Sequence, residues 1–211
     1  LVRISASPVR RLQKKTVTGQ KLPGPRGNKD AVLSSQLNDR CLLIGFPGYR
    51  EAAQRLARAA GIPYADALIH HFPDGETRLR LPESLPGHVV LCQSLDHPNS
   101  RLVELVLAAA TARDLGVKNI TLVAPYLCYM RQDKAFHPGE AVSQRIVGSL
   151  LSQWIDALIT VDSHLHRVHQ LKDAVPVNPA INLSATPVMS AFLEEQMDNP
   201  LLVGPDKESE Q

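Results

Sequence analysis

The 211-residue chain is poor in aromatic residues, which make up 4% of it, and it has three cysteines. Cys41, Cys92 and Cys128 are far apart and form no C-x-x-C pair, which argues against a disulfide framework. We therefore expect buried free thiols in a reducing compartment, and a cytoplasmic protein. No apolar run approaches the roughly eighteen residues that a membrane-spanning helix needs, so we expect no membrane partner.

The chain also lacks a strong charge. Its net charge of +2 is too small to indicate nucleic acid as a partner, and its 44% of hydrophobic residues predict a globular core. Residues 1–38 differ from the rest because they carry many cations, one acid and no sustained apolar period. They are interpreted as a leader added for expression, a disordered basic tail or an Arg-rich targeting segment, and we exclude them from the fold.

The common phosphate-binding loops are absent from the sequence. Gly19 and Gly24 have P-loop spacing, but Pro25 and Arg26 follow where that loop needs Lys and Ser or Thr. Neither G-x-G-x-x-G nor the G-x-S-x-G turn of hydrolases occurs. A bound nucleotide would have to be held in another way.

Short apolar runs alternate with helical patterns from Cys41 onward. The predicted strands are 41–46, 65–72, 78–81, 88–94, 119–126, 157–162 and 201–206, and the predicted helices are 49–61, 98–116, 140–154 and 186–196. Gly61 is a plausible helix stop, and Pro98 suits a first helical position. Apolar strands separated by helices are typical of right-handed βαβ units. The sequence therefore predicts an α/β fold, with a mostly parallel sheet flanked by helices.

Polar residues follow several predicted strands, and in open parallel sheets ligands bind beyond the carboxyl ends of the strands. These residues are Gln93, Ser94 and Asp96 after one strand, Arg131, Gln132, Asp133 and Lys134 after the next, then Asp162 and His164, and finally Asp206. Arg131 offers a planar fork that suits phosphate, and Lys134 offers a point charge. Loops are commonly polar, so each strand exit taken alone is weak evidence.

Two short motifs have both a chemical and a plain structural interpretation. Asp162 and His164 could share a divalent cation, although such a pair is more often a solvated loop. His166 and His169 allow a zinc site of several histidines, which is weaker because no cysteine lies near. The motif "FPDGE" (72–76) is by itself a β-turn signal.

Taken in order, the motifs "FPDGE", "QS", "PYLCYMRQDK", "VDSH" and "GPD" resemble those of the ribose-phosphate pyrophosphokinases, the phosphoribosyl diphosphate synthases. The resemblance runs from about Cys41 to Asp206. It implies a phosphoribosyltransferase-like domain in a homo-oligomer that holds ATP between subunits. It also implies transfer of the β,γ-diphosphate of ATP to C1 of ribose 5-phosphate, with Mg²⁺ and release of AMP.

The resemblance also implies roles for particular residues. Phe72, Asp74 and Glu76 of one subunit would contact the adenine, and Arg131, Gln132, Asp133 and Lys134 of another would contact the nucleotide. Asp162, His164 and Asp206 would hold the metal, and His164 would take part in catalysis.

The sequence departs from the family in having no adjacent aspartate pair with a Gly/Thr-rich loop, the usual ribose 5-phosphate site. We therefore expect residues 39–206 to be the amino-terminal domain, residues 207–211 to begin a second one, and this chain alone to be inactive. Two alternatives stay open. One is a non-catalytic regulatory subunit that binds nucleotide and associates with a synthase; the other is a phosphoribosyltransferase, which needs an acidic phosphate loop.

Overall fold

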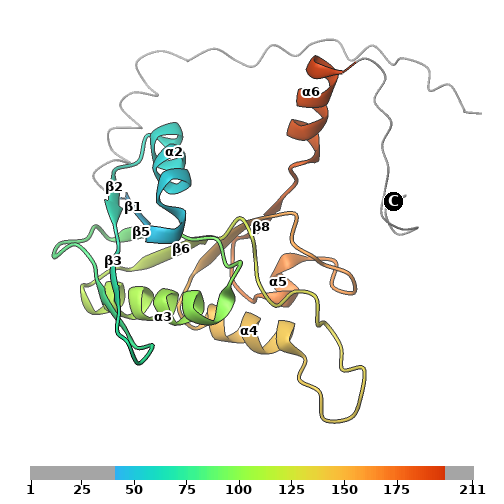
Figure 1. Ribbon diagram of the computed structural model, residues 1–211, viewed down its shortest axis with the longest axis horizontal. Helices are drawn as coiled ribbons and strands as arrows, with labels where there is room; N and C mark the ends of the chain where they lie inside the picture. Colours follow the sequence, from blue (N-terminus) through green and yellow to red (C-terminus); the bar gives the residue numbers. More distant parts are fainter. Residues whose placement is uncertain (1–40, 198–211) are drawn as a thin grey trace, which may run out of the picture.

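Six parallel strands form the central sheet of the computed structural model, which describes residues 41–197 (Figure 1). In spatial order they are β2 (Tyr64–Asp66), β1 (Cys41–Gly45), β5 (His88–Cys92), β6 (Asn119–Val123), β7 (Ala157–Val161) and β8 (Ala180–Leu183). The chain runs from β1 outward to β2, then returns to β5 and continues in the opposite direction. This reversal makes a topological switch point between β1 and β5.

Helices cover the two faces of the sheet unequally. The helices are α2 (Arg50–Ala60), α3 (Pro98–Asp114), α4 (Ser143–Ser152), α5 (Leu171–Ala174) and α6 (Thr186–Gln196), with a 3-10 turn η1 (Pro47–Tyr49) before α2. Figure 1 shows α2 on one side of the sheet, α3, α4 and α5 on the other, and α6 standing apart. The predicted α/β fold with a parallel sheet is therefore confirmed.

The core lies mainly between the sheet and α3. Strand β5 is apolar after His88, and the buried side chains of α3 are leucine and alanine apart from Glu104. Leu105 and Ala109 of α3 are fully buried, as are Leu91 of β5 and Ile120 and Leu122 of β6. Burial on both faces explains why these strands read as continuous apolar runs rather than alternating ones.

The structure corrects two sequence-based boundaries and adds two elements. The predicted strand 65–72 divides at Ala67 into β2 and β3 (Leu68–His71), and β3 leaves the main sheet to pair antiparallel with β4 (Thr77–Arg80). The helix predicted from 140 starts at Ser143 because the Glu140 carboxylate accepts hydrogen bonds from the backbone N–H groups of Phe136 and His137, closing a loop instead. Elements β8 and α5 were not predicted, since each has only four residues.

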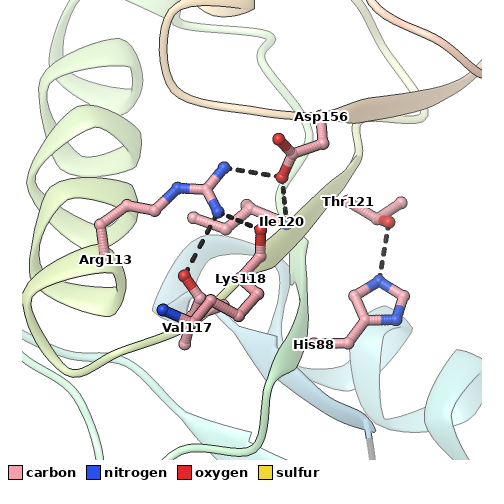
Figure 2. Close-up of polar contacts among 7 residues, drawn as sticks. All are labelled: His88, Arg113, Val117, Lys118, Ile120, Thr121 and Asp156. Carbon is pink, nitrogen blue, oxygen red and sulfur yellow. Dashed lines mark hydrogen bonds and ion pairs between the residues drawn. The ribbon is translucent and has the colours of Figure 1, made fainter.

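At the edge of the sheet where the strands begin, called the amino edge below, the ion pair of Arg113 and Asp156 joins several elements (Figure 2). Arg113, near the end of α3, donates to the Asp156 carboxylate at 2.6 Å and to the carbonyl oxygens of Val117 and Lys118. Asp156 also accepts the backbone N–H of Ile120 at 2.6 Å. This cluster ties the end of α3 to the start of β6 and to the residue that precedes β7.

Two further expectations can be compared with the described residues. Cys41, Cys92 and Cys128 are buried and free, as predicted, and burial raises the pKa of the Cys92 thiol to about 11. None of the helices between residues 41 and 197 has the length and hydropathy of a membrane span. The basic segment 1–38, the predicted strand 201–206 with Asp206, and residues 207–211 lie outside the described residues.

Candidate active site

The carboxyl ends of β6 and β7 form the walls of a pocket of about 230 Å³. The two strands are adjacent and parallel, so the loops that follow them leave the sheet side by side. The pocket is lined by Tyr126, Leu127, Met130 and Arg131 from the first loop, and by Val161, Asp162, Ser163 and His164 from the second strand and its loop. The structure thus brings three predicted site residues together: Arg131, Asp162 and His164.

Asp162 is held in an unusual conformation at the exit of β7. Its φ of +42° lies in the left-handed region, which aspartate tolerates better than most residues. Its Oδ2 accepts the backbone N–H of Ala185 at 3.0 Å, and its own N–H donates to the carbonyl of Leu183 at 2.8 Å. These bonds tie the exit of β7 to the chain that follows β8, and they leave Oδ1 for another partner.

His164 and Asp162 are the residues of the pocket that could hold a metal ion. The exposed imidazole of His164 lies parallel to that of His166, with ring centroids 6.2 Å apart. Mg²⁺ commonly takes one or two protein ligands and completes its shell with water and phosphate oxygens, so this donor set fits it. Within residues 41–197, no three His, Cys, Asp or Glu residues gather as a metal-binding group, which gives no support to the multi-histidine zinc alternative.

The four residues of "RQDK" have different surroundings. Arg131 is exposed and lines the pocket, whereas the Lys134 ammonium lies 4.8 Å from the ring centroid of Phe136. Gln132 is half-buried and its carbonyl accepts the backbone N–H of Gln144. These positions leave Arg131 as the member of the motif that faces the pocket.

Asp133 is bound to the neighbouring loop. Its carboxylate accepts a hydrogen bond of 2.6 Å from Arg167, and its side chain is 2% exposed. Burial raises the pKa of this carboxyl, but the hydrogen bond and the charge of Arg167 outweigh that effect and hold the pKa below its usual value. The pair therefore links the "RQDK" loop to the loop that carries His164.

The "FPDGE" segment forms the turn of the β3–β4 hairpin. The N–H of Phe72 donates to the carbonyl of Glu76 at 2.8 Å, and Asp74 accepts the N–H of Glu76 at 3.1 Å. Gly75 has φ +93°, which a residue with a side chain would adopt only with strain. The β-turn interpretation is confirmed, and the turn leaves Phe72 39% exposed. No residue of this turn lines the pocket, so one chain keeps the two predicted nucleotide motifs apart.

Buried polar atoms without partners gather at the same edge of the sheet. Among the described residues they are Gln93 Oε1, Asp133 Oδ2, Thr160 Oγ1 and Ser163 Oγ. All four lie at or beyond the carboxyl end of β5, β6 or β7. Buried polar groups are normally paired, and exceptions cluster where a ligand or a catalytic role explains them.

Three residues near this edge were not predicted from the sequence: Glu104, Ser163 and Arg167. Ser163 and Arg167 were hidden in a polar loop, where any residue could have been solvated. Glu104 had a signal that could have found it, because it lies four residues before Ala108 and eight before Ala112, on the buried stripe of α3. A carboxylate on such a stripe needs partners.

Comparisons with known proteins give a consistent result. A family model described as the N-terminal domain of ribose phosphate pyrophosphokinase matches residues 41–154. Proteins named ribose-phosphate pyrophosphokinase from Methanobrevibacter smithii and Methanopyrus kandleri are 34% and 36% identical, over 79% and 73% of this chain. These alignments cover 55% and 53% of the two relatives, so the chain spans about half the length of the relatives it matches.

A solved structure agrees on the fold. The crystal structure of phosphoribosylpyrophosphate synthetase from Mycobacterium smegmatis aligns with a TM-score of 0.63 at 22% identity, covering 74% of this chain and 52% of that one. This likeness extends the fold assignment to the phosphoribosyltransferase-like architecture.

Proposed function

The chain belongs to the ribose-phosphate pyrophosphokinase family, and from this premise we propose that it carries the nucleotide-binding half of a ribose-phosphate diphosphokinase. The whole protein would transfer the β,γ-diphosphate of ATP to ribose 5-phosphate. In that reaction the C1 hydroxyl oxygen forms a bond to the β-phosphorus and loses its proton. The bond between the β-phosphorus and the oxygen bridging to the α-phosphorus breaks, and AMP leaves with that oxygen.

The main support for the proposal is that Arg131, Asp162 and His164 line one pocket. This pocket lies at the edge of the sheet where the strands end, called the carboxyl edge below. A diphosphate in transfer spreads negative charge over its oxygens, so catalysis depends on positioned cations more than on covalent chemistry. The guanidinium of Arg131 can donate two parallel hydrogen bonds to phosphate oxygens. Lys134, on the same loop, would add a positive charge, and Gln132 would add amide donors.

Asp162 and His164 would hold Mg²⁺ with the phosphates, and Asp206 would join them from outside the described residues. When bound, the ion would neutralise charge on the β- and γ-phosphates. The backbone N–H of Ala185 binds one oxygen of Asp162, and the residue lines the pocket, so its other oxygen would serve the ion. We assign the catalytic role to His164, because it lines the same pocket as Arg131 from a different loop.

The separation of the hairpin from the pocket supports a homo-oligomer. Phe72 is exposed enough to stack on a purine, and Glu76 can accept a hydrogen bond from its exocyclic amine. Asp74 keeps one oxygen in its own turn and has the second for the base. We propose that the hairpin of one subunit and the pocket of another bind the same ATP. A cytoplasmic location, supported by the three buried free thiols, completes the proposal.

Phosphorus NMR of ATP with Mg²⁺ tests the function directly. We expect the chain to broaden and shift the β- and γ-phosphate resonances, and Arg131→Ala to weaken binding by about tenfold or more, as loss of a charged hydrogen bond does. Arg58→Ala, an exposed arginine on α2, is the matched control and should bind like the unchanged chain. Equal binding by Arg131→Ala and the unchanged chain would contradict the assignment.

The same experiment with ribose 5-phosphate separates the alternatives. The 211 residues contain no adjacent aspartate pair, so we expect ATP to bind without formation of AMP. Addition of a full-length synthase of the family then distinguishes a regulatory subunit, which would change that enzyme's rate, from a catalytic half, which would not. Turnover by this chain alone would show that it holds a complete ribose 5-phosphate site.

A further inference from the structure

Glu104 is a buried carboxylate that the proposed reaction does not use. It lies in the middle of α3, and the residue is 7% exposed. Burial of a carboxylate is costly unless several donors satisfy its oxygens. Its two oxygens have different partners, and these partners come from different parts of the chain.

One oxygen of Glu104 faces the carboxyl edge of the sheet. Gln93, the first residue after β5, donates its side-chain N–H to Glu104 Oε2 at 2.8 Å. Because the carboxylate is an acceptor, the amide of Gln93 must turn its nitrogen toward it. The amide oxygen of Gln93 then points elsewhere, and it is one of the four buried atoms without a partner.

The other oxygen of Glu104 faces the hairpin. His71, the last residue of β3, places Nε2 at 3.5 Å from Glu104 Oε1. Its Nδ1 lies 3.2 Å from the hydroxyl oxygen of Thr77, the first residue of β4 and its cross-strand partner. The imidazole therefore lies between α3 and the base of the turn, with Nε2 in ion-pairing range of Glu104 and Nδ1 in hydrogen-bonding range of Thr77.

This contact lies directly beside the predicted adenine-binding turn. Ile69 and Leu79 hold the strands of the hairpin to the core through apolar packing. Within residues 41–197, His71–Glu104 is the only side-chain ion pair or hydrogen bond that joins the hairpin to α3. Phe72 follows His71 without an intervening residue, so this contact lies at the residue from which the turn starts. Figure 1 shows the hairpin projecting from the sheet past α3.

We propose that Glu104 is a positioning residue that couples the hairpin turn 72–76 to the carboxyl edge through His71 on one side and Gln93 on the other. This inference rests on the proposed function, because the turn is useful to catalysis only if it contacts the nucleotide. Glu104 itself touches no substrate. It sets where Phe72 and Glu76 stand, and it holds Gln93 with the amide oxygen available at the edge.

Amide hydrogen exchange tests the coupling without any nucleotide. In Glu104→Gln the neutral side chain can satisfy only one of the two donors well, so we expect exchange at Phe72 and its neighbours in the hairpin to become about tenfold faster. Exchange in β5 and β6 should stay within about twofold of the original. Glu51→Gln, an exposed residue in the first turn of α2, makes the same charge change and should leave the hairpin unaffected.

Substitution at His71 separates positioning from simple loss of packing. His71→Phe removes the donor to Glu104 and should speed hairpin exchange as Glu104→Gln does. His71→Gln retains an N–H donor and should restore much of the protection. If all protected amides accelerate together, or if His71→Gln behaves like His71→Phe, the positioning role is overturned.

A second experiment measures the Kd for ATP in the presence of Mg²⁺. If the hairpin binds the base, Glu104→Gln should raise the Kd for ATP by about tenfold, while Glu51→Gln should not change it. Faster hairpin exchange in a chain that binds no ATP would support the coupling and refute the proposed function. Tight ATP binding with unchanged exchange and unchanged Kd in Glu104→Gln would refute the coupling and leave the function intact.

Discussion

The two edges of the central sheet are both polar, but their polar groups are arranged differently. At the amino edge Asp156 accepts hydrogen bonds from Arg113 and from the backbone of Ile120, and Arg113 also satisfies two carbonyls (Figure 2). At the carboxyl edge the side chains of Gln93, Asp133, Thr160 and Ser163 each keep a buried oxygen without a partner among the described residues. The first edge is built for stability, whereas the second retains unused bonding capacity.

The difference follows from the topology. In a parallel sheet every strand enters at one edge and leaves at the other, so the two sets of loops never mix. Loops at the entry edge can be held permanently by hydrogen bonds and ion pairs within the chain. At the exit edge the loops after β6 and β7 line the pocket, where a ligand can supply the missing partners.

The largest effect on stability is expected at the amino edge. Asp156→Ala leaves the buried backbone N–H of Ile120 and the guanidinium of Arg113 without their acceptor. We expect the free energy of unfolding to fall by about 1–3 kcal/mol, the cost of an unmade buried hydrogen bond. Urea denaturation measures it, with the exposed Asp114→Ala as control. ATP affinity should not change; a loss of affinity without a loss of stability would break the distinction between the edges.

A matched pair of Thr→Val substitutions sharpens the comparison. Thr121 bonds the His88 ring at 2.9 Å, whereas Thr160 is fully buried and its hydroxyl has no partner. We expect Thr121→Val to lose about 1 kcal/mol of unfolding free energy, because a hydrogen bond disappears. Thr160→Val should gain about 1 kcal/mol, because it removes an unpaired polar atom from the core. Changes of the same sign at both sites would contradict the contrast.

The smallest expected effect is the loss, at acidic pH, of the contact between Asp133 and Arg167 that links two loops. The pKa of Asp133 is lowered from 3.8 in the folded chain, so its pair with Arg167 contributes stability at pH values above about 4. The contribution is lost as the pH falls through the lowered folded-state pKa. We expect NMR signals of the Arg167 guanidinium to remain those of the bound form at pH 4 and to change at lower pH.

Asp133→Asn provides the control for that titration. It should show the unbound Arg167 signals at every pH, with no transition in the acidic range. A transition well above pH 4 in the unchanged chain would mean that Arg167 does not hold the carboxylate as described.

Some elements of the fold could be predicted from the sequence, and others could not. The strand at 88–92 and the helix α3 could be predicted from the sequence. A strand that is buried on both faces has a continuous run of apolar residues, and α3 has apolar residues at helical spacing. The strand 65–72 was misread as one element, since nothing local distinguishes β2 from β3 across Ala67. Short β8 was missed because four residues carry too little periodicity.

Local sequence patterns were enough to predict the order of apolar strands and helices, the turn at "FPDGE" and the position of polar residues after the strands. These depend on local backbone preference and on the periods of 2 and 3.6 residues. Two arrangements could be seen only in the folded chain. Arg131 faces the pocket while Asp133 binds Arg167. Glu104 joins His71 to Gln93. The physical reason is that a polar side chain can reach several neighbours, and its partner is fixed only when distant segments are packed at bonding distance.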